Sequence, residues 1–183
     1  MQPLVSIGVP VFNGERYLAG ALDSLLAQTY PNTQIIVSDN CSTDDTPLIL
    51  EAYRARFPNL RYSRSETFLD VHFNFQRVLD AATGDYFMWA ADDDRWEPTF
   101  IAKIMEGLAD PRFVTGFCQL DKVNVDSGET AQGFREPPHF AADARLAQNQ
   151  LLFLQRPCFW MIYGIHKTTA IRAVMSIRSK RDI

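Results

Sequence analysis

Three consecutive aspartates, Asp92, Asp93 and Asp94, follow an apolar run at residues 86–91 that predicts a buried strand. Like charges this close oppose one another's ionisation. A hard divalent cation such as Mn²⁺ or Mg²⁺ relieves that repulsion, because it prefers carboxylate oxygens. A metal held here could bridge phosphate oxygens and stabilise a departing diphosphate. A solvated, helix-capping loop explains the same residues, so the tripeptide alone leaves both interpretations open.

Two further polar clusters follow apolar runs. Phe12 and Asn13 come after residues 4–11, and Asp39 comes after residues 34–38. In a sheet of parallel strands, ligands bind at the carboxyl ends of the strands. The sequence therefore predicts one site built from three strand ends, which strengthens the metal interpretation of the acidic run.

Hydrophobic periodicity predicts an alternation of strands and helices along the chain. Strands are expected at residues 4–11, 34–38, 60–64 and 86–91, one or two within 113–125, and a last one at 159–165. Helices are expected at residues 15–28, 44–57, 73–82, 98–108, 142–154 and 168–178. Thr43 or Asp44 is the predicted cap of the second helix, and Gly84 the predicted C-cap of the third. This order indicates an α/β fold, a Rossmann-like, doubly wound and mostly parallel sheet flanked by helices.

Composition narrows the function classes. The 183 residues are 46% hydrophobic with a formal net charge of -4, so we expect one globular domain and no nucleic-acid partner. The three cysteines are far apart and form no zinc or disulfide pattern, which favours a reducing, cytoplasmic location. No signal peptide or membrane span is expected. The basic C-terminal helix could rest on the cytoplasmic membrane face, although a solvated helix face is the simpler interpretation.

Phosphate-loop, dinucleotide-binding and serine-hydrolase motifs are absent from the sequence. Two blocks instead carry a family pattern. Residues 5–46 contain a strand ending in Pro-x-Phe-Asn, a helix ending in Ser-Leu-x-x-Gln-Thr-Tyr, and a strand ending in Asp-x-x-Ser-x-Asp. Residues 72–101 contain a helix, an Ala-x-Gly-Asp-Tyr turn, and the acidic motif followed by Trp-x-Pro. With a weaker third block at 158–174, the chain resembles the family 2 glycosyltransferases, which have the GT-A fold.

The resemblance implies a role for each matching residue. Residues 1–96 would be the nucleotide-sugar-binding half, and residues 97–183 an incomplete acceptor-side half. The residues implied to lie around the base and ribose are Pro10, Val11, Phe12, Asn13, Glu15 and Asn40. Asp39 would accept a hydrogen bond from the base, which suits N3–H of uracil. Asp92 would contact the ribose, Asp93 would be the principal metal ligand, and Asp94 would support it.

Two departures from the family pattern matter. Many relatives carry Asp-x-Asp-Asp, whereas Ala91 stands at the first of these positions here. Inverting relatives also use a carboxylate base late in the domain, and no matching motif precedes Ile183, because Asp182 fits it poorly. We therefore expect the base beyond Ile183, with Asp121, Asp126 and Asp143 as open alternatives.

The resulting hypothesis is an inverting glycosyltransferase that takes a nucleoside-diphosphate sugar, UDP-linked, and a carbohydrate or lipid-linked acceptor. The main alternative is a non-catalytic or truncated nucleotide-sugar-binding domain, since no base is visible. A sugar nucleotidyltransferase would need a Gly-rich loop after the first strand, which VPVFNGER lacks. The loop at 134–140 could gate the acceptor, although a plain surface loop explains it at least as well. Five aromatic side chains could stack on sugars, although most of them are more simply core. Those aromatic residues are Trp89, Trp96, Phe159, Trp160 and Tyr163.

Overall fold

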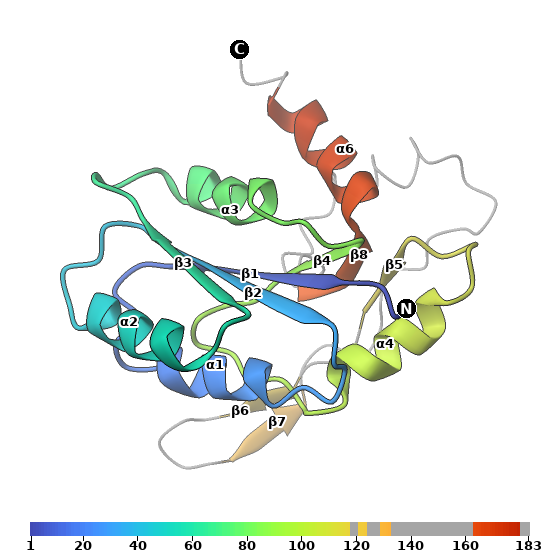
Figure 1. The fold of residues 1–183 in the computed structure, drawn as a ribbon, viewed down its shortest axis with the longest axis horizontal. Helices are drawn as coiled ribbons and strands as arrows, with labels where there is room; N and C mark the ends of the chain where they lie inside the picture. The colour runs from blue at the N-terminus through green and yellow to red at the C-terminus, as the bar shows by residue number, and fades with distance from the viewer. Residues whose placement is uncertain (118–120, 124–128, 133–162, 180–183) are drawn as a thin grey trace.

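The computed structural model describes residues 1–117, 121–123, 129–132 and 163–179 of the chain (Figure 1). A six-stranded sheet in the order β3-β2-β1-β4-β8-β5 forms its centre. These strands are β1 (Val5–Val11), β2 (Thr33–Asp39), β3 (Leu60–Arg64), β4 (Tyr86–Trp89), β5 (Thr115–Gly116) and β8 (Ile165–Lys167). The helices are α1 (Leu18–Leu26), α2 (Thr46–Arg56), α3 (Val71–Asp80), α4 (Phe100–Leu108) and α6 (Thr168–Ser179). Two further strands, β6 (Asp121–Val123) and β7 (Thr130–Gln132), pair with each other.

The sheet is mostly parallel, which confirms the fold class predicted from the sequence. Strands β3, β2, β1 and β4 run parallel, and β8 pairs antiparallel with both β4 and β5. Consequently the carboxyl ends of four adjacent strands meet at one edge. This is the edge at which open α/β sheets bind ligands.

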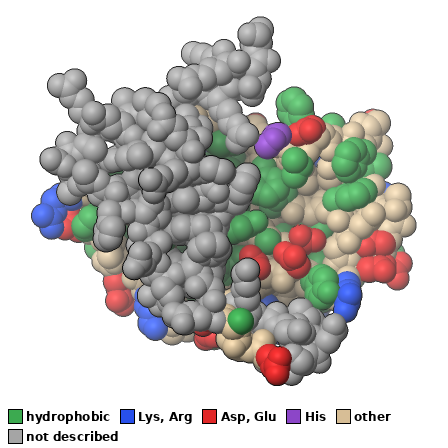
Figure 2. Space-filling model, turned by 180° about the vertical axis from the view of Figure 1, so that it is seen from behind, with side chains coloured by type: hydrophobic (Ala, Val, Ile, Leu, Met, Phe, Trp, Pro, Cys, Tyr) green, Lys and Arg blue, Asp and Glu red, His purple; other side chains and the backbone are tan. Residues whose placement is uncertain are grey.

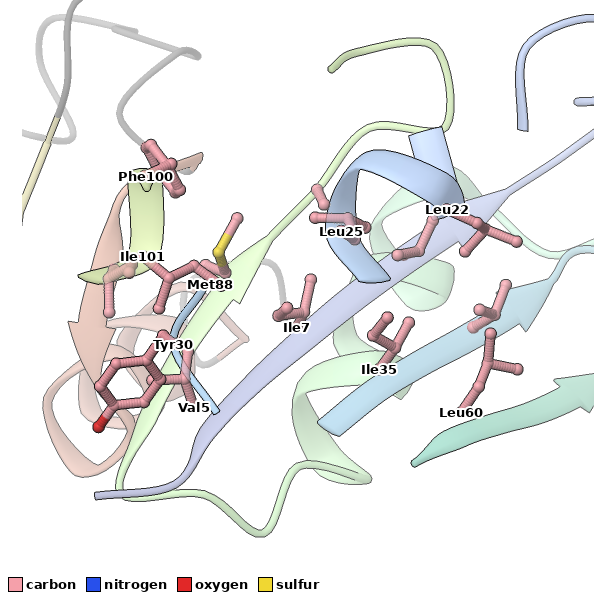
Figure 3. Packing of buried hydrophobic residues seen from close by; sticks show 14 of the residues in the cluster. Val5, Ile7, Leu22, Leu25, Tyr30, Ile35, Leu60, Met88, Phe100 and Ile101 are labelled. Atoms are coloured by element: carbon pink, nitrogen blue, oxygen red, sulfur yellow. The ribbon is translucent and has the colours of Figure 1, made fainter. Parts of the chain in front are cut away.

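Helices cover both faces of the sheet, so its central strands are apolar on both sides. Helices α1, α2 and α4 pack on the face that carries Ile7, Ile35 and Met88 (Figure 3). Helices α3 and α6 pack on the opposite face, against Ile36 and Phe87. Because neighbouring side chains on a strand alternate between faces, each strand contributes to both layers of the core.

Element boundaries differ from the sequence-based expectation at the start of α1 and at the end of α3, among other places. Helix α1 begins at Leu18 rather than Glu15, because residues 14–17 form a turn in which the Tyr17 and Leu18 amides both donate to the Gly14 carbonyl. The prediction that Gly84 is a C-cap is wrong, since α3 ends at Asp80. The Gly84 amide instead donates to the Ser6 hydroxyl at 2.8 Å. A Cβ at Gly84 would lie 2.6 Å from the Leu4 carbonyl oxygen, so glycine allows a close approach to β1.

The later elements are described only in part. The last strand, β8, spans Ile165–Lys167, later than the predicted 159–165. The predicted helix at 142–154 and the predicted loop at 134–140 lie outside the described residues. Among the helices that are described, none is both long enough and apolar enough to cross a membrane.

Helix α6 is tied to α3 through a basic side chain. The Arg172 guanidinium donates through Nη2 to the Leu79 and Ala82 carbonyls at 3.0 and 2.8 Å. Carbonyl groups at the end of a helix lack partners within the helix, and a cation satisfies them. Arg172 therefore connects α6 to the end of α3, and this basic residue is engaged within the protein.

Candidate functional site

Three polar loops meet at the carboxyl edge of the sheet, as the sequence predicts. The register pairs Val11 of β1 with Asp39 of β2, and Gly8 of β1 with Trp89 of β4. The loops that follow these strands are therefore neighbours, although Phe12 and Asp92 are 80 positions apart in the sequence. Figure 2 shows acidic and hydrophobic side chains next to one another on the described part of the surface.

Hydrogen bonds join the loop after β1 to the loop after β2. The Asn13 amide donates to the Ser42 hydroxyl at 2.9 Å, and the Thr43 amide donates to Asn13 Oδ1 at 2.9 Å. The Gly14 amide donates to the Thr46 hydroxyl at 2.8 Å. Asn13 has a φ of 53°, a conformation that asparagine tolerates better than most residues. These hydrogen bonds join the two loops into one polar wall of the candidate site.

Acidic side chains extend this wall. The Glu15 amide donates to Asp44 Oδ2, and the Asp45 amide donates to Glu15 Oε2, each at 3.0 Å. The N-cap residue of α2 is Asp45, so the prediction that Thr43 or Asp44 caps this helix is wrong. Asp44 Oδ1 nevertheless accepts from the Thr46 amide, the first of the helix, at 3.0 Å. Desolvation opposes ionisation of Asp44, but the hydrogen bonds from Thr46 and Glu15 outweigh it and lower the pKa of Asp44.

The acidic run lies directly against the loop after β1. A Cβ at Gly14 would lie 2.5 Å from Asp92 Oδ2, so the absence of a side chain there leaves room for the carboxylate. Burial raises the pKa of Asp92 to about 6, and the charges of Asp93, Asp94 and Asp44 add to this rise. Burial and the charge of Asp93 raise the pKa of Asp94 as well. The site therefore holds carboxylates whose ionisation is unfavourable unless a cation compensates them.

The donor chemistry of this run fits a hard divalent cation. Asp93 and Asp94 are exposed and offer carboxylate oxygens. Within the described part of the chain, no group of three or more His, Cys, Asp or Glu side chains is arranged to hold a metal ion. A cation bound here would thus need further oxygen ligands from outside these side chains, such as those of a phosphate group or water.

Asp39 is enclosed by its own neighbours. Its side chain is fully buried, and Oδ1 accepts from the Ser42 amide at 2.9 Å. Oδ2 accepts from the Tyr62 hydroxyl at 3.3 Å and lies 3.3 Å from Arg64 Nε. Burial, together with the charge of Asp39, raises the pKa of Tyr62 to about 12. The carboxylate is therefore stabilised by two hydrogen-bond donors and by the guanidinium of Arg64.

Asn40 holds the loop after β3 in place. Its side-chain amide donates to the Leu69 carbonyl and accepts from the Leu69 amide, both at 2.8 Å. The same loop carries Phe68, whose ring meets that of Phe12 edge to face with centroids 4.9 Å apart. Both rings are exposed, Phe12 at 46% and Phe68 at 63%. Together they offer an apolar surface beside the polar wall.

The remaining predicted residues are more varied in their positions. Pro10 and Val11 are buried within β1, and Val11 belongs to the core. Of the aromatic residues considered for sugar stacking, Trp89 lies in the core. Tyr163 lies near the acidic run, because its pKa is raised first by burial and then by the charges of the Asp92–Asp94 carboxylates. Asp121 lies on β6. The residues considered above that lie outside the described ranges are Asp126, Asp143, Phe159, Trp160 and Asp182.

Three residues at this edge are absent from the sequence-based set, namely Tyr62, Arg64 and Phe68. The β2–β3 register pairs Asp39 with Arg64, and this places Tyr62 and Arg64, which share one face of β3, against Asp39. The only local signal is the polar run Arg-Tyr-Ser-Arg at residues 61–64, and this run also fits a solvated strand. Phe68 stands in a polar loop without any pattern around it.

Comparisons with known proteins agree on a family. The family model described as glycosyl transferase family 2 matches residues 6–169. The chain is 36% identical over 146 residues to an uncharacterised protein of Mycobacterium tuberculosis, covering 75% of this chain and 42% of that protein. It is 30% identical over 182 residues to a Bacillus subtilis protein provisionally named teichuronic acid biosynthesis glycosyltransferase TuaG, covering 100% of this chain and 70% of TuaG. The chain thus spans about two fifths of the mycobacterial relative's length.

Solved structures agree on the fold. S. aureus TarS 1-349 in complex with UDP-GlcNAc superposes with a TM-score of 0.68 at 23% identity, over 90% of this chain and 45% of TarS. The mannosyltransferase PcManGT from Pyrobaculum calidifontis, in complex with GDP-Man and Mn²⁺, superposes with a TM-score of 0.59 at 25% identity. That match covers 63% of this chain and 35% of PcManGT.

Proposed function

Because the chain belongs to glycosyl transferase family 2, we propose that it binds a nucleoside-diphosphate sugar at the carboxyl edge of its sheet and transfers the sugar to an acceptor hydroxyl with inversion. One observation carries this proposal. The partly buried Asp92 carboxylate lies against Gly14, which belongs to the loop after β1. Asn13 of the same loop is hydrogen-bonded to the loop after β2. A nucleoside-diphosphate sugar has an apolar base for the Phe12 ring, hydroxyl groups for the carboxylates, and phosphates that a cation at the acidic run would bind.

UDP is the proposed nucleotide. TarS, solved with UDP-GlcNAc, supports this choice, and PcManGT, solved with GDP-Man, makes GDP the competing one. The exposed face of Phe12 offers a stacking surface for the base. The Asp92 carboxylate accepts hydrogen bonds when ionised, which suits the ribose hydroxyls. The hydrogen-bonded loops would position the donor, and such positioning supplies a large part of the rate in transfer reactions.

Asp93 and Asp94 are the residues that would hold a divalent metal, Mn²⁺ or Mg²⁺. When bound, the metal supplies electrostatic stabilisation of the leaving diphosphate. The raised pKa of Asp94 supports this assignment, since a cation removes the cost of ionising two neighbouring carboxyl groups.

The acceptor hydroxyl requires a base within hydrogen-bond reach. The family resemblance favours a carboxylate beyond Ile183, with Asp121, Asp126 and Asp143 as alternatives within the chain. A carbohydrate or a lipid-linked carbohydrate is the proposed acceptor. A lipid-linked acceptor would bring the basic C-terminal segment near anionic headgroups, which is the proposed membrane contact.

Calorimetric titration with UDP, with and without Mn²⁺, tests the donor site. We expect UDP to bind the wild-type chain in the presence of Mn²⁺, and Asp93→Ala to weaken that binding at least tenfold, because a charge-assisted ligand is lost. Glu106→Ala removes an exposed acid from α4 and is the matched control, with unchanged binding. Undiminished binding by Asp93→Ala would overturn the metal assignment. Release of UDP from a UDP-sugar only when acceptor is added would separate an enzyme from a binding module.

A further inference from the structure

Helix α1 and the turn after it contact the segment that follows the acidic run. Gly20, Ser24 and Gln28 are spaced four positions apart, a spacing that places side chains along one side of a helix. The Arg95 guanidinium lies over Gly20, where a Cβ would be 2.7 Å from Nη2. The Trp96 amide donates to the Ser24 hydroxyl at 3.3 Å. Successive residues after the acidic run are thus attached to α1.

Gln28 uses both ends of its side-chain amide in these contacts. Its Nε2 donates to the Glu97 carbonyl at 2.9 Å and to the Ser24 carbonyl at 3.1 Å. Its Oε1 accepts from the Ile101 amide at 3.0 Å. That amide belongs to the first turn of α4, whose own N-cap residue, Thr99, makes no side-chain cap hydrogen bond. Gln28 therefore joins α1, the segment after the acidic run and the start of α4.

The carboxylates proposed to bind the metal depend on anchors at both ends of the acidic run. Upstream, the Ala90 amide donates to the Gly8 carbonyl at 2.9 Å, which continues the pairing of β4 with β1. Within the described ranges, neither Asp93 nor Asp94 makes a hydrogen bond to another residue. Their positions are therefore set by Ala90 on one side and by the segment that Gln28 holds on the other.

We propose that Gln28 is a positioning residue for the metal site, acting through the backbone of residues 95–98 on Asp93 and Asp94. This inference rests on the proposed function, because it requires a cation at the acidic run. Loss of a group that orients metal ligands typically weakens metal binding by about ten- to hundredfold. Gln28 orients the ligands only through the backbone, so we expect a loss of about tenfold, the lower end of this range.

A purely structural role, in which Gln28 only caps α4, predicts a different result. Loss of a cap lowers the melting temperature but leaves the metal affinity of the folded protein unchanged. Gln28→Glu separates the two roles. Its carboxylate can still accept from the Ile101 amide, and a negative charge is favourable at a helix N-terminus. When ionised, however, it has no N–H to donate to the Glu97 carbonyl.

The test is calorimetric titration with UDP at one fixed, subsaturating Mn²⁺ concentration, and again in EDTA, at a temperature well below unfolding. In Mn²⁺, Gln28→Met and Gln28→Glu should both bind UDP about tenfold more weakly than the wild type, whereas any binding in EDTA should equal that of the wild type. The added charge of Gln28→Glu by itself favours a cation, so a loss of affinity in this variant is not an effect of charge.

Gln76→Met is the matched control, because the Gln76 amide donates to Asp80 Oδ1 within α3, and its affinity should equal that of the wild type in both conditions. Wild-type affinity of Gln28→Glu in Mn²⁺ would show that Gln28 only caps α4, and would overturn this inference while leaving the donor site intact. A loss that is equally large in EDTA would overturn it too, because the effect would not involve the metal.

Failure of the wild-type chain to gain affinity for UDP from Mn²⁺ overturns the proposed metal site and this inference together. Thermal unfolding verifies that each variant is folded. If Gln28→Met does not fold, Gln28→Glu decides the question alone, because it has the same shape as the wild-type side chain and retains the cap of α4.

Discussion

Asp92→Asn should stabilise the metal-free protein at alkaline pH. The wild-type carboxyl group is partly buried and surrounded by acids, and its pKa rises from 3.8 to about 6 on folding. A carboxyl group with a raised pKa stabilises the fold in its neutral form, below its unfolded pKa. That stabilisation is lost as the pH rises through about 6. Asparagine has the same shape and never ionises, so the variant avoids the loss.

The pKa difference sets the magnitude. A rise from 3.8 to about 6 corresponds to about 3 kcal/mol between the two protonation states. We therefore expect Asp92→Asn to raise the free energy of unfolding by about 1–3 kcal/mol at pH 8, the lower end allowing for solvent screening. At pH 4.5 the folded wild type is mostly protonated at this position, and the advantage should shrink to about 1 kcal/mol or less.

Thermal unfolding in EDTA at the two pH values measures this difference. For a chain of this length, 1 kcal/mol changes the melting temperature by roughly 2–4 °C. Glu106→Gln, an exposed acid on α4, is the control and should behave like the wild type at both pH values. An Asp92→Asn variant that is less stable than the wild type at pH 8, or whose advantage does not depend on pH, would refute the electrostatic reasoning.

Other substitutions test the packing of the site. Gly14→Ala places a Cβ 2.5 Å from Asp92 Oδ2 and should cost about 1–3 kcal/mol in unfolding free energy and weaken UDP binding. A Cβ at Gly107 would have no atom within 4 Å, so Gly107→Ala should raise the free energy of unfolding by about 0.5–1 kcal/mol through the helix propensity of α4. A lower free energy of unfolding in this variant would contradict the geometry. Asn40→Ala removes both hydrogen bonds to Leu69 and should lower the free energy of unfolding by about 1–3 kcal/mol, with faster hydrogen exchange of the Leu69 amide. Unchanged exchange would show that Asn40 does not hold this loop in place.

Much of the fold could be predicted because its central strands are short apolar runs bounded by polar residues. Strands β1 and β2 and helix α4 appear close to their expected positions. Strand β5 lies within the predicted range 113–125, but the bounds of β5 and β8 could not be predicted, because two or three residues are too few for a periodic pattern. Gly84 was misassigned because a glycine near a helix end usually caps it, whereas here it makes room for β1.

The candidate site was predictable at the level of its loops but not of its contacts. Phe12, Asp39 and Asp92 follow apolar runs, and parallel strands bring such positions to one edge. The enclosure of Asp39 by Arg64 depends on the register between two strands, which no local pattern reveals. For the same reason, the sequence alone could not show that Asn40 binds the backbone of a distant loop.

Paramagnetic broadening of amide NMR signals by Mn²⁺, in the presence of UDP, tests most directly whether the carboxyl edge is the donor site. The amides of Gly14, Ser42 and Asp93 should broaden, and that of Gly107, on α4, should stay sharp. Broadening that spares the first three amides, or that needs no UDP and survives Asp93→Ala, would contradict a metal and nucleotide site at this edge.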